Sequence, residues 1–165
     1  MSAIANRPVT LRTTLVGSVV VAGLIIAVLR QLDVFVVYGL LLKVPFLVQL
    51  QFIASGLLGP AAFAGGLGSA LLGLSLHVVF SLVIAAVFIL AATRLPVLRR
   101  NLILGGLLYG VGVYFDMNFV VTPLSAAPPS EGITLAVIVE GIIGHALLIG
   151  LPLAVIARRN AVDGT

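Results

Sequence analysis

The sequence contains no cysteine and no tryptophan, and only 8% of its 165 residues are charged. Without cysteine there is no disulfide framework, no thiolate metal site and no cysteine nucleophile. Soluble domains are nearer to about one quarter charged, so the low charge content argues against an ordinary soluble protein. Apolar residues dominate instead, at 61% of the chain, and the mean hydropathy is +1.31. This composition is typical of an integral membrane protein.

Acidic residues are also scarce, with 5 Asp and Glu against 9 Lys and Arg. The basic residues lie near the ends of apolar runs and form no single patch, which indicates membrane topology and excludes a nucleic-acid surface. With a cytoplasmic N-terminus, only Arg30 and Lys43 lie outside. The basic residues that then lie inside are Arg7, Arg12, Arg94, Arg99, Arg100, Arg158 and Arg159. We therefore expect both termini on the cytoplasmic side.

Four apolar segments are long enough to cross about 30 Å of hydrocarbon as helices. They cover about residues 13–32, 66–92, 102–121 and 133–157. Between the first two spans the chain stays apolar but carries scattered polar residues, and Pro45 suits the first turn of a helix. Residues 44–58 are therefore predicted to form an interfacial helix. Residues 1–165 are thus predicted to be one all-α transmembrane domain, a four-helix bundle with an additional interfacial helix between spans 1 and 2.

Several polar residues fall inside these spans, where they are costly and usually face protein or water. At about 1.5 Å per residue, the two histidines, His77 and His145, lie at similar depths on different helices. The other polar residues lie on the outer side of the two histidines. They are Arg30, Asp33, Asp116, Asn118 and Glu140. The sequence predicts that these residues form an intramembrane polar cluster in the outer half of the bilayer.

Small residues recur at every fourth position of the second span. The row is Gly65, Ser69, Gly73, His77, Ser81 and Ala85. Such rows allow another helix backbone to approach closely, which predicts that His77 faces a neighbouring helix. Gly112 and Gly144 lie in similar rows beside Asp116 and Glu140. Gly65, Ser69, Gly73, Gly112 and Gly144 are therefore the predicted helix-packing positions.

The polar residues allow several functions. His77 and His145 could ligate a haem b from two helices, or join Glu140 and Asp116 at a divalent metal ion. The same residues could line a proton or small-solute pathway that opens to the outer side. The remaining interpretation is structural: Arg30 pairs with Asp33, Asp116 with Asn118 or a tyrosine, and Glu140 with a histidine.

Motifs of soluble enzymes are absent, since no G-x-S-x-G, H-E-x-x-H or phosphate-binding glycine pattern occurs. We therefore expect a non-enzymatic structural or accessory bundle in contact with membrane lipids. Its expected partners are further copies of itself or a larger membrane complex, and not nucleic acid. An electron or proton carrier that uses His77 and His145 is the alternative.

Four longer segments of the sequence are distinctive. They are RQLDVF, QFIASGLLGPAAFAGGLGSALLGLSLH, LLYGVGVYFDMNFVVTPLSAAPP and HALLIGLPLAVIARR. Together they resemble the YagU-like family of small four-span proteins of the bacterial inner membrane. The resemblance extends from about Leu15 to Arg159 and implies the topology and location of that family, but no activity. Asp33, His77 and His145 match positions of the family pattern, whereas Asp116 stands where the family has an apolar residue.

Overall fold

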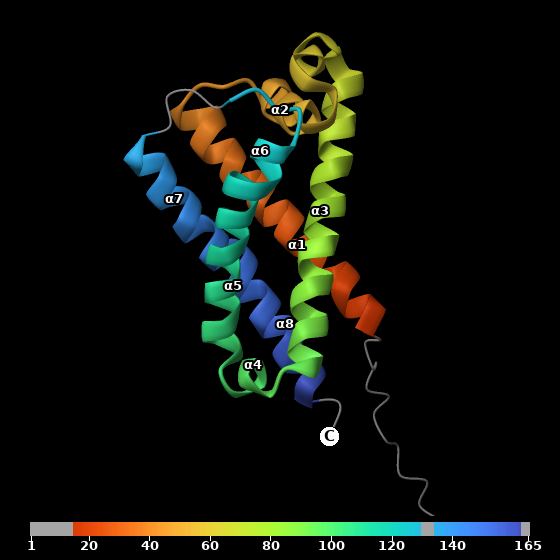
Figure 1. Ribbon diagram of the computed structural model, residues 1–165, viewed down its shortest axis with the longest axis vertical. Coiled ribbons are helices and arrows are strands. Elements are labelled where there is room, and N and C mark those ends of the chain that lie inside the picture. Colours follow the sequence, from red (N-terminus) through yellow and green to blue (C-terminus); the bar gives the residue numbers. More distant parts are fainter. Residues whose placement is uncertain (1–14, 130–133, 163–165) are drawn as a thin grey trace, which may run out of the picture.

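The computed structural model describes residues 15–129 and 134–162, which form helices and no β-strand (Figure 1). Five helical segments within these ranges are long and apolar enough to cross a membrane. They are Leu15–Leu41, Phe46–Ala64, Gly66–Arg94, Leu102–Leu124 and Leu135–Arg159. The predicted all-α class is confirmed, and the described helices are those of a multi-pass membrane protein.

The number of such segments differs from the sequence prediction, which counted four. The additional segment consists of α2 (Phe46–Leu58) and the 3₁₀-helix η2 (Gly59–Ala64). Pro60 does not interrupt it, because proline is tolerated in the first turn of a helix and Pro60 lies in the first turn of η2. Phe46–Ala64 thus contains 19 helical residues in two pieces that meet at Gly59, where the sequence predicted one helix over residues 44–58.

The remaining long helices extend along the length of the molecule, whereas α2 runs across one end of it (Figure 1). They are α1 (Leu15–Val34), α3 (Gly66–Arg94), α5 (Leu102–Asp116), α7 (Leu135–His145) and α8 (Leu151–Val162). The short helix α6 (Thr122–Leu124) lies near α2, and α4 (Pro96–Arg100) lies at the opposite end. We refer to the two ends of the molecule as the α2 end and the α4 end.

Three helices contain π-helical segments, and each segment is followed within four residues by a proline. The helix of α1 continues as η1 (Phe35–Leu41), beyond residue 32, where the sequence placed the end of the first span. Segment η3 (Met117–Val121) precedes Pro123, and η4 (Ala146–Gly150) precedes Pro152. Proline cannot donate the next backbone hydrogen bond. In η4 the Leu151 N–H instead bonds to the carbonyl of Ala146, five residues earlier, so the helix continues through the proline.

Glycine is required at the two sharp changes of direction between α2 and α3. Gly59 has φ = 60° and Gly66 has φ = 56°, a left-handed conformation that side chains with a Cβ rarely adopt. The Gln51 side chain supports this connection by donating to the carbonyl of Gly66 over 3.0 Å. These contacts hold α2 against the first turns of α3.

The row of small residues in α3 faces α2 first and α1 further along. A Cβ at Gly73 would collide with the Leu50 carbonyl of α2, and the Ser69 hydroxyl is buried and donates to the carbonyl of Ala62 over 2.6 Å. Gly65 differs, because it is exposed and a Cβ there would meet only Ser69 and Ala62. Further towards the α4 end, Ala85 is fully buried in the core that α3 forms with α1.

Towards the α4 end the helices form a continuous apolar core. Its most deeply buried members come from α1, α3 and α8, and they are Ala22, Ile26, Ala85, Phe88, Ile89, Leu153 and Ala154. Tyr109 of α5 extends this core, since its ring lies 5.1 Å from that of Phe88 and its hydroxyl donates to the Ile84 carbonyl over 2.8 Å. The half of the molecule at the α4 end is therefore a packed apolar core, and the predicted polar cluster lies on the α2 side of it.

Glycines also bring α5 close to η4. Cβ atoms at Gly106 and Gly150 would each collide with the backbone of the other helix. A Cβ at Gly110 would likewise collide with the carbonyl of His145. These close approaches fix the height of α7 and η4 relative to α5, and with it the position of His145.

Candidate functional site

The site begins with an ion pair on α1. Arg30 and Asp33 are three residues apart, a spacing that places two side chains on the same face of a helix. The Arg30 guanidinium donates to the Asp33 carboxylate, as the sequence predicted. Both side chains are partly buried, with exposed fractions of 12% and 20%.

Glu140 of α7 joins this pair at Gly144. A Cβ at Gly144 would lie 2.7 Å from Arg30 Nη1, 3.0 Å from Glu140 Oε1 and 3.2 Å from Asp33 Oδ2. Because glycine has no side chain, the three charged groups can meet in the space above it. The Glu140 and Asp33 carboxyls therefore lie close to each other, since both are near the same Cβ position. Glu140 therefore meets Arg30 and Asp33, whereas the sequence paired it with a histidine.

The charges in this cluster do not cancel. Two carboxyl groups share one guanidinium, and two carboxylates side by side repel each other in a medium of low dielectric constant. The cluster therefore favours one further positive charge between Asp33 and Glu140. Arg30 already lies close enough to influence both carboxyls electrostatically.

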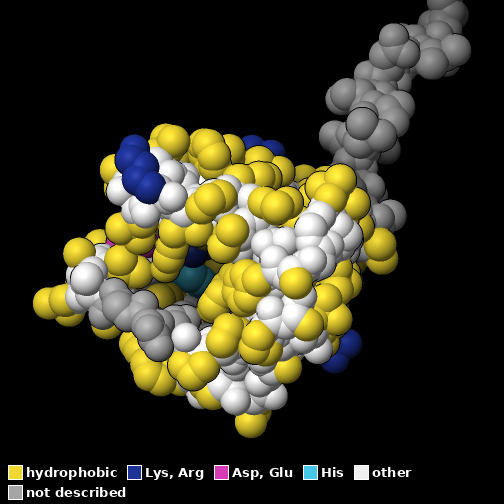
Figure 2. All heavy atoms as spheres, turned by 90° about the horizontal axis from the view of Figure 1, so that it is seen from above, with side chains coloured by type: hydrophobic (Ala, Val, Ile, Leu, Met, Phe, Trp, Pro, Cys, Tyr) yellow, Lys and Arg dark blue, Asp and Glu magenta, His cyan; other side chains and the backbone are white. Residues whose placement is uncertain are grey.

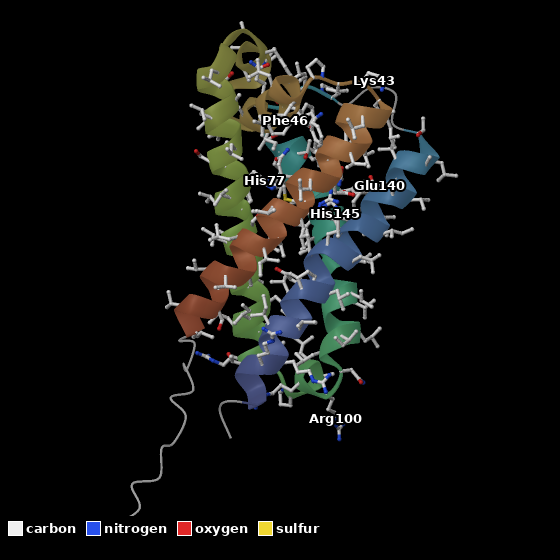
Figure 3. All side chains as sticks on the ribbon, turned by 180° about the vertical axis from the view of Figure 1, so that it is seen from behind. Lys43, Phe46, His77, Arg100, Glu140 and His145 are labelled. Carbon is white, nitrogen blue, oxygen red and sulfur yellow. The ribbon has the colours of Figure 1, made fainter. Side chains whose placement is uncertain are left out.

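The histidines lie beside this cluster, His77 on a third helix, α3, and His145 at the end of α7, the helix that carries Glu140 (Figure 3). His77 Nε2 on α3 lies 3.0 Å from the Ala27 carbonyl oxygen of α1. A carbonyl oxygen only accepts hydrogen bonds, so Nε2 carries the proton and the neutral ring keeps Nδ1 as its acceptor. Arg30 lies one turn further along α1 and influences both histidines electrostatically. His77 thus joins α3 to α1 directly below the ion pair.

His145 has the opposite tautomer. Its Nδ1 donates to the Gly141 carbonyl within α7 over 2.7 Å, which leaves Nε2 as the acceptor of the neutral ring. The ring meets that of Tyr114 edge to face, with centroids 5.3 Å apart. Tyr114 also fills the space beside Gly141, where a Cβ would lie 2.6 Å from its ring. The imidazole is therefore fixed on two sides.

Tyr38 lies near the site and was not among the predicted site residues. It lies in η1, eight residues after Arg30. Its hydroxyl is close enough to Arg30, Asp33, Glu140 and Tyr114 to interact with them electrostatically. The signal in the sequence was its spacing from Arg30. Steps of three or four residues along a helix stay on one face, and two such steps lead from Arg30 through Val34 to Tyr38. That face was recognisable only once the first helix was extended through η1.

Two predicted members of the polar cluster lie elsewhere. The Asp116 side chain is exposed on α5, and the Asn118 amide donates to the Tyr114 carbonyl over 2.8 Å and not to Asp116. Gly112 is also exposed, and a Cβ there would meet no atom within 4 Å. Gly112 thus makes no helix-packing contact with the described part of the chain, since its face of α5 is turned away from the other described helices.

The two ligand sets suggested by the sequence fit the described residues poorly. No three His, Cys, Asp or Glu side chains within residues 15–129 and 134–162 are arranged to hold a metal ion. Haem ligation by His77 through Nε2 would break its bond to the Ala27 carbonyl.

The cluster is accessible from two directions. Seen from the α2 end, the molecule is hollowed, and a histidine and a basic side chain lie at the bottom of the hollow (Figure 2). On the flank, an open groove of about 860 Å³ lies between α1 and α7. Its lining residues are Asp33, Leu135, Ala136, Val139, Glu140, Ile143, Gly144, Leu147 and Leu148. Asp33 and Glu140 are thus part of a largely apolar lateral groove.

Searches with protein-family models, among curated proteins and among solved structures gave no match for this chain. The resemblance to the YagU-like family accordingly stays a prediction.

Proposed function

We propose that this protein crosses a bacterial inner membrane four times, with α2 lying at the outer interface and both termini in the cytoplasm. The distribution of charge supports this orientation, because basic residues favour the cytoplasmic side. The basic residues of the α4 end are Arg94, Arg99, Arg100, Arg158 and Arg159, whereas Lys43 lies at the α2 end (Figure 3). Arg7 and Arg12 lie outside the described residues. The transverse course of α2 supports an interfacial position (Figure 1).

Within this topology, the protein is a non-enzymatic accessory protein that binds a small cation or a proton from the outer side. The observation that carries this proposal is the convergence of Arg30, Asp33 and Glu140 above Gly144. Two carboxyl groups opposite one guanidinium favour a positively charged ligand. Ionisable residues at membrane depth are expensive and usually functional.

The other half of the molecule favours binding over conduction. Between the cluster and the α4 end lies the apolar core of Ile26, Phe88, Ile89 and Leu153, each at most 4% exposed. A transmembrane pathway needs polar groups or water along its whole length. A site open on one side and closed by apolar packing on the other suits a binding protein or the sensing subunit of a complex.

Self-association through the glycine rows, which the sequence favoured, receives less support. Gly73, Gly106 and Gly110 lie against other helices of the same chain, where a Cβ would collide with backbone atoms. These positions are therefore not available to a second copy.

Charge-selective thiol labelling tests the proposed function, because the chain has no native cysteine. Tyr38→Cys places a thiol on the half-buried face of η1, near the charged cluster, and Val36→Cys places one on the outer surface of the same segment, where Val36 is 47% exposed. Right-side-out vesicles are treated with a cationic (trimethylammonium) or an anionic (sulfonate) methanethiosulfonate. Each rate is divided by the rate of the same reagent with a free thiol in solution.

We expect the cationic reagent to label Tyr38→Cys at least about tenfold faster than the anionic reagent, since about 1.4 kcal/mol corresponds to a factor of ten. The preference should fall when Glu140→Gln is added. Val36→Cys should react slowly with both reagents, because lipid excludes the water that a thiolate needs. Equal rates with the two reagents at Tyr38→Cys, or no reaction with either, would contradict the proposed function.

A further inference from the structure

The lateral groove between α1 and α7 gives the cation site a second entrance, from the side of the bundle. Its lining consists of two neighbouring rows of α7 and η4. The outer row is apolar and exposed, and its members are Leu135, Val139, Ile143 and Leu147. The inner row consists of Ala136, Glu140, Gly144 and Leu148. Small residues one turn above and below Glu140, Ala136 and Gly144, therefore leave the carboxyl uncovered within the groove.

The dimensions of the groove suit one aliphatic chain. From Glu140 to Leu148 the helix advances about 12 Å at 1.5 Å per residue, in the direction of the bilayer centre. An extended chain advances about 1.2 Å per bond, so about ten carbon atoms occupy this length. The groove has a volume of about 860 Å³ and is open along its side, so it can hold such a chain without enclosing it.

The charges in the groove specify the head of such a ligand. Asp33 and Glu140 are its acidic lining residues, and the one guanidinium that they share belongs to Arg30. An occupant with one positive charge would balance the second carboxyl, whereas an anionic head would meet two carboxyls. Since the groove faces the surroundings of the bundle, an apolar chain can enter from the bilayer without passing through water.

We propose that the ligand is an amphiphile dissolved in the surrounding bilayer, with one ammonium head and one aliphatic chain of about ten carbon atoms. The head lies between Asp33 and Glu140, and the chain follows Gly144 and Leu148 towards the bilayer centre. This inference rests on the proposed cation site and adds the chemical class of its ligand. A small inorganic cation would satisfy the carboxyls but leave the apolar groove without a role.

Photolabelling in proteoliposomes tests this inference. The probe is a decylamine with a diazirine at the far end of its chain, and labelled peptides are identified by mass spectrometry. The competitors are decylamine, decanol with the same chain and no charge, and butylamine with the same head and a short chain. Glu140→Gln removes one carboxyl of the cluster, and Asp116→Asn removes an exposed carboxyl outside it as the matched control.

We expect label at residues 143–148, loss of that label with excess decylamine, and little change with decanol or butylamine. Glu140→Gln should lower the labelling at least about tenfold, as expected for the loss of a charge-assisted hydrogen bond, and Asp116→Asn should leave it unchanged. Asp33→Asn provides a second variant, and circular dichroism verifies that the helices of each variant are intact.

Three results would overturn the inference: equal competition by decanol, equal competition by butylamine, or label outside the groove. None of these results decides whether a small cation binds, because that question depends on the rates at Tyr38→Cys. A strong preference for the cationic thiol reagent together with competition by butylamine would retain the proposed function and reject the amphiphile.

Discussion

Replacing Gly73 by alanine tests how closely α2 and α3 approach each other. A Cβ at Gly73 would collide with the Leu50 carbonyl and lie 3.2 Å from the Ala54 nitrogen. Both obstructing groups belong to the backbone of α2, so no side-chain rotation can make room. Helix α2 would have to move away from α3 as a whole, and the contacts along both helices would weaken.

The expected cost follows from two opposing effects. Alanine in place of a glycine inside a helix gains up to about 1 kcal/mol from backbone entropy. Overpacking of a close contact typically costs about 1–3 kcal/mol, and here the backbone of a second helix must shift. The upper part of this range, about 2–3 kcal/mol, applies because the obstructing atoms are backbone. Subtracting the gain of up to about 1 kcal/mol, we expect Gly73→Ala to lower the free energy of unfolding by about 1–2 kcal/mol in total.

Gly112→Ala is the matched control, because it makes the same substitution inside α5 where a Cβ meets nothing within 4 Å. It should leave stability unchanged or raise it by up to about 1 kcal/mol. The assay is unfolding by sodium dodecyl sulfate in mixed micelles, followed by circular dichroism. Equal effects of the two substitutions would refute the close approach of α2 and α3.

Two hydrogen bonds give further predictions. Tyr109→Phe removes the donor to the Ile84 carbonyl and should cost about 1 kcal/mol in the same unfolding assay, whereas retention of full stability would show that this bond is absent. His77→Ala should destabilise more than His145→Ala, because His77 joins two helices through the Ala27 carbonyl while His145 bonds within its own helix. The reverse order would contradict the assignment.

Most of the helices can be predicted from the sequence. The apolar runs, the basic residues that close them and the absence of soluble-enzyme motifs give the all-α membrane class and the approximate ends of the long helices. Phe46–Ala64 was underestimated, because Gln49, Gln51 and Ser55 lower its hydropathy. In the structure these three side chains are buried, and Gln51 bonds to the connection with α3.

The partners within the candidate site are harder to predict. The pair Arg30–Asp33 is local and follows from a spacing of three residues. The contact of Glu140 with that pair depends on where α7 crosses α1, which is determined by close approaches such as Gly110 against His145. Sequence spacing carries no information on such a crossing point.

The π-helical segments are a second source of error. Each of them adds a residue to a helical turn and so rotates everything beyond it relative to a regular helix. Tyr38 lies within η1, near the cluster, so its direction could not be predicted from regular helical spacing. Prolines two residues after η3 and η4 are the signal by which such segments could be recognised.

The central claim is that Arg30 and Glu140, which lie on different helices, belong to one charged site. A double-mutant cycle with Arg30→Gln, Glu140→Gln and the double variant measures this directly as free energies of unfolding. Without Arg30 the two carboxyls only repel each other, so Glu140→Gln should cost less, or even stabilise, in that background. We predict a coupling energy of about 0.5–3 kcal/mol. Additive effects of the two substitutions would contradict the site.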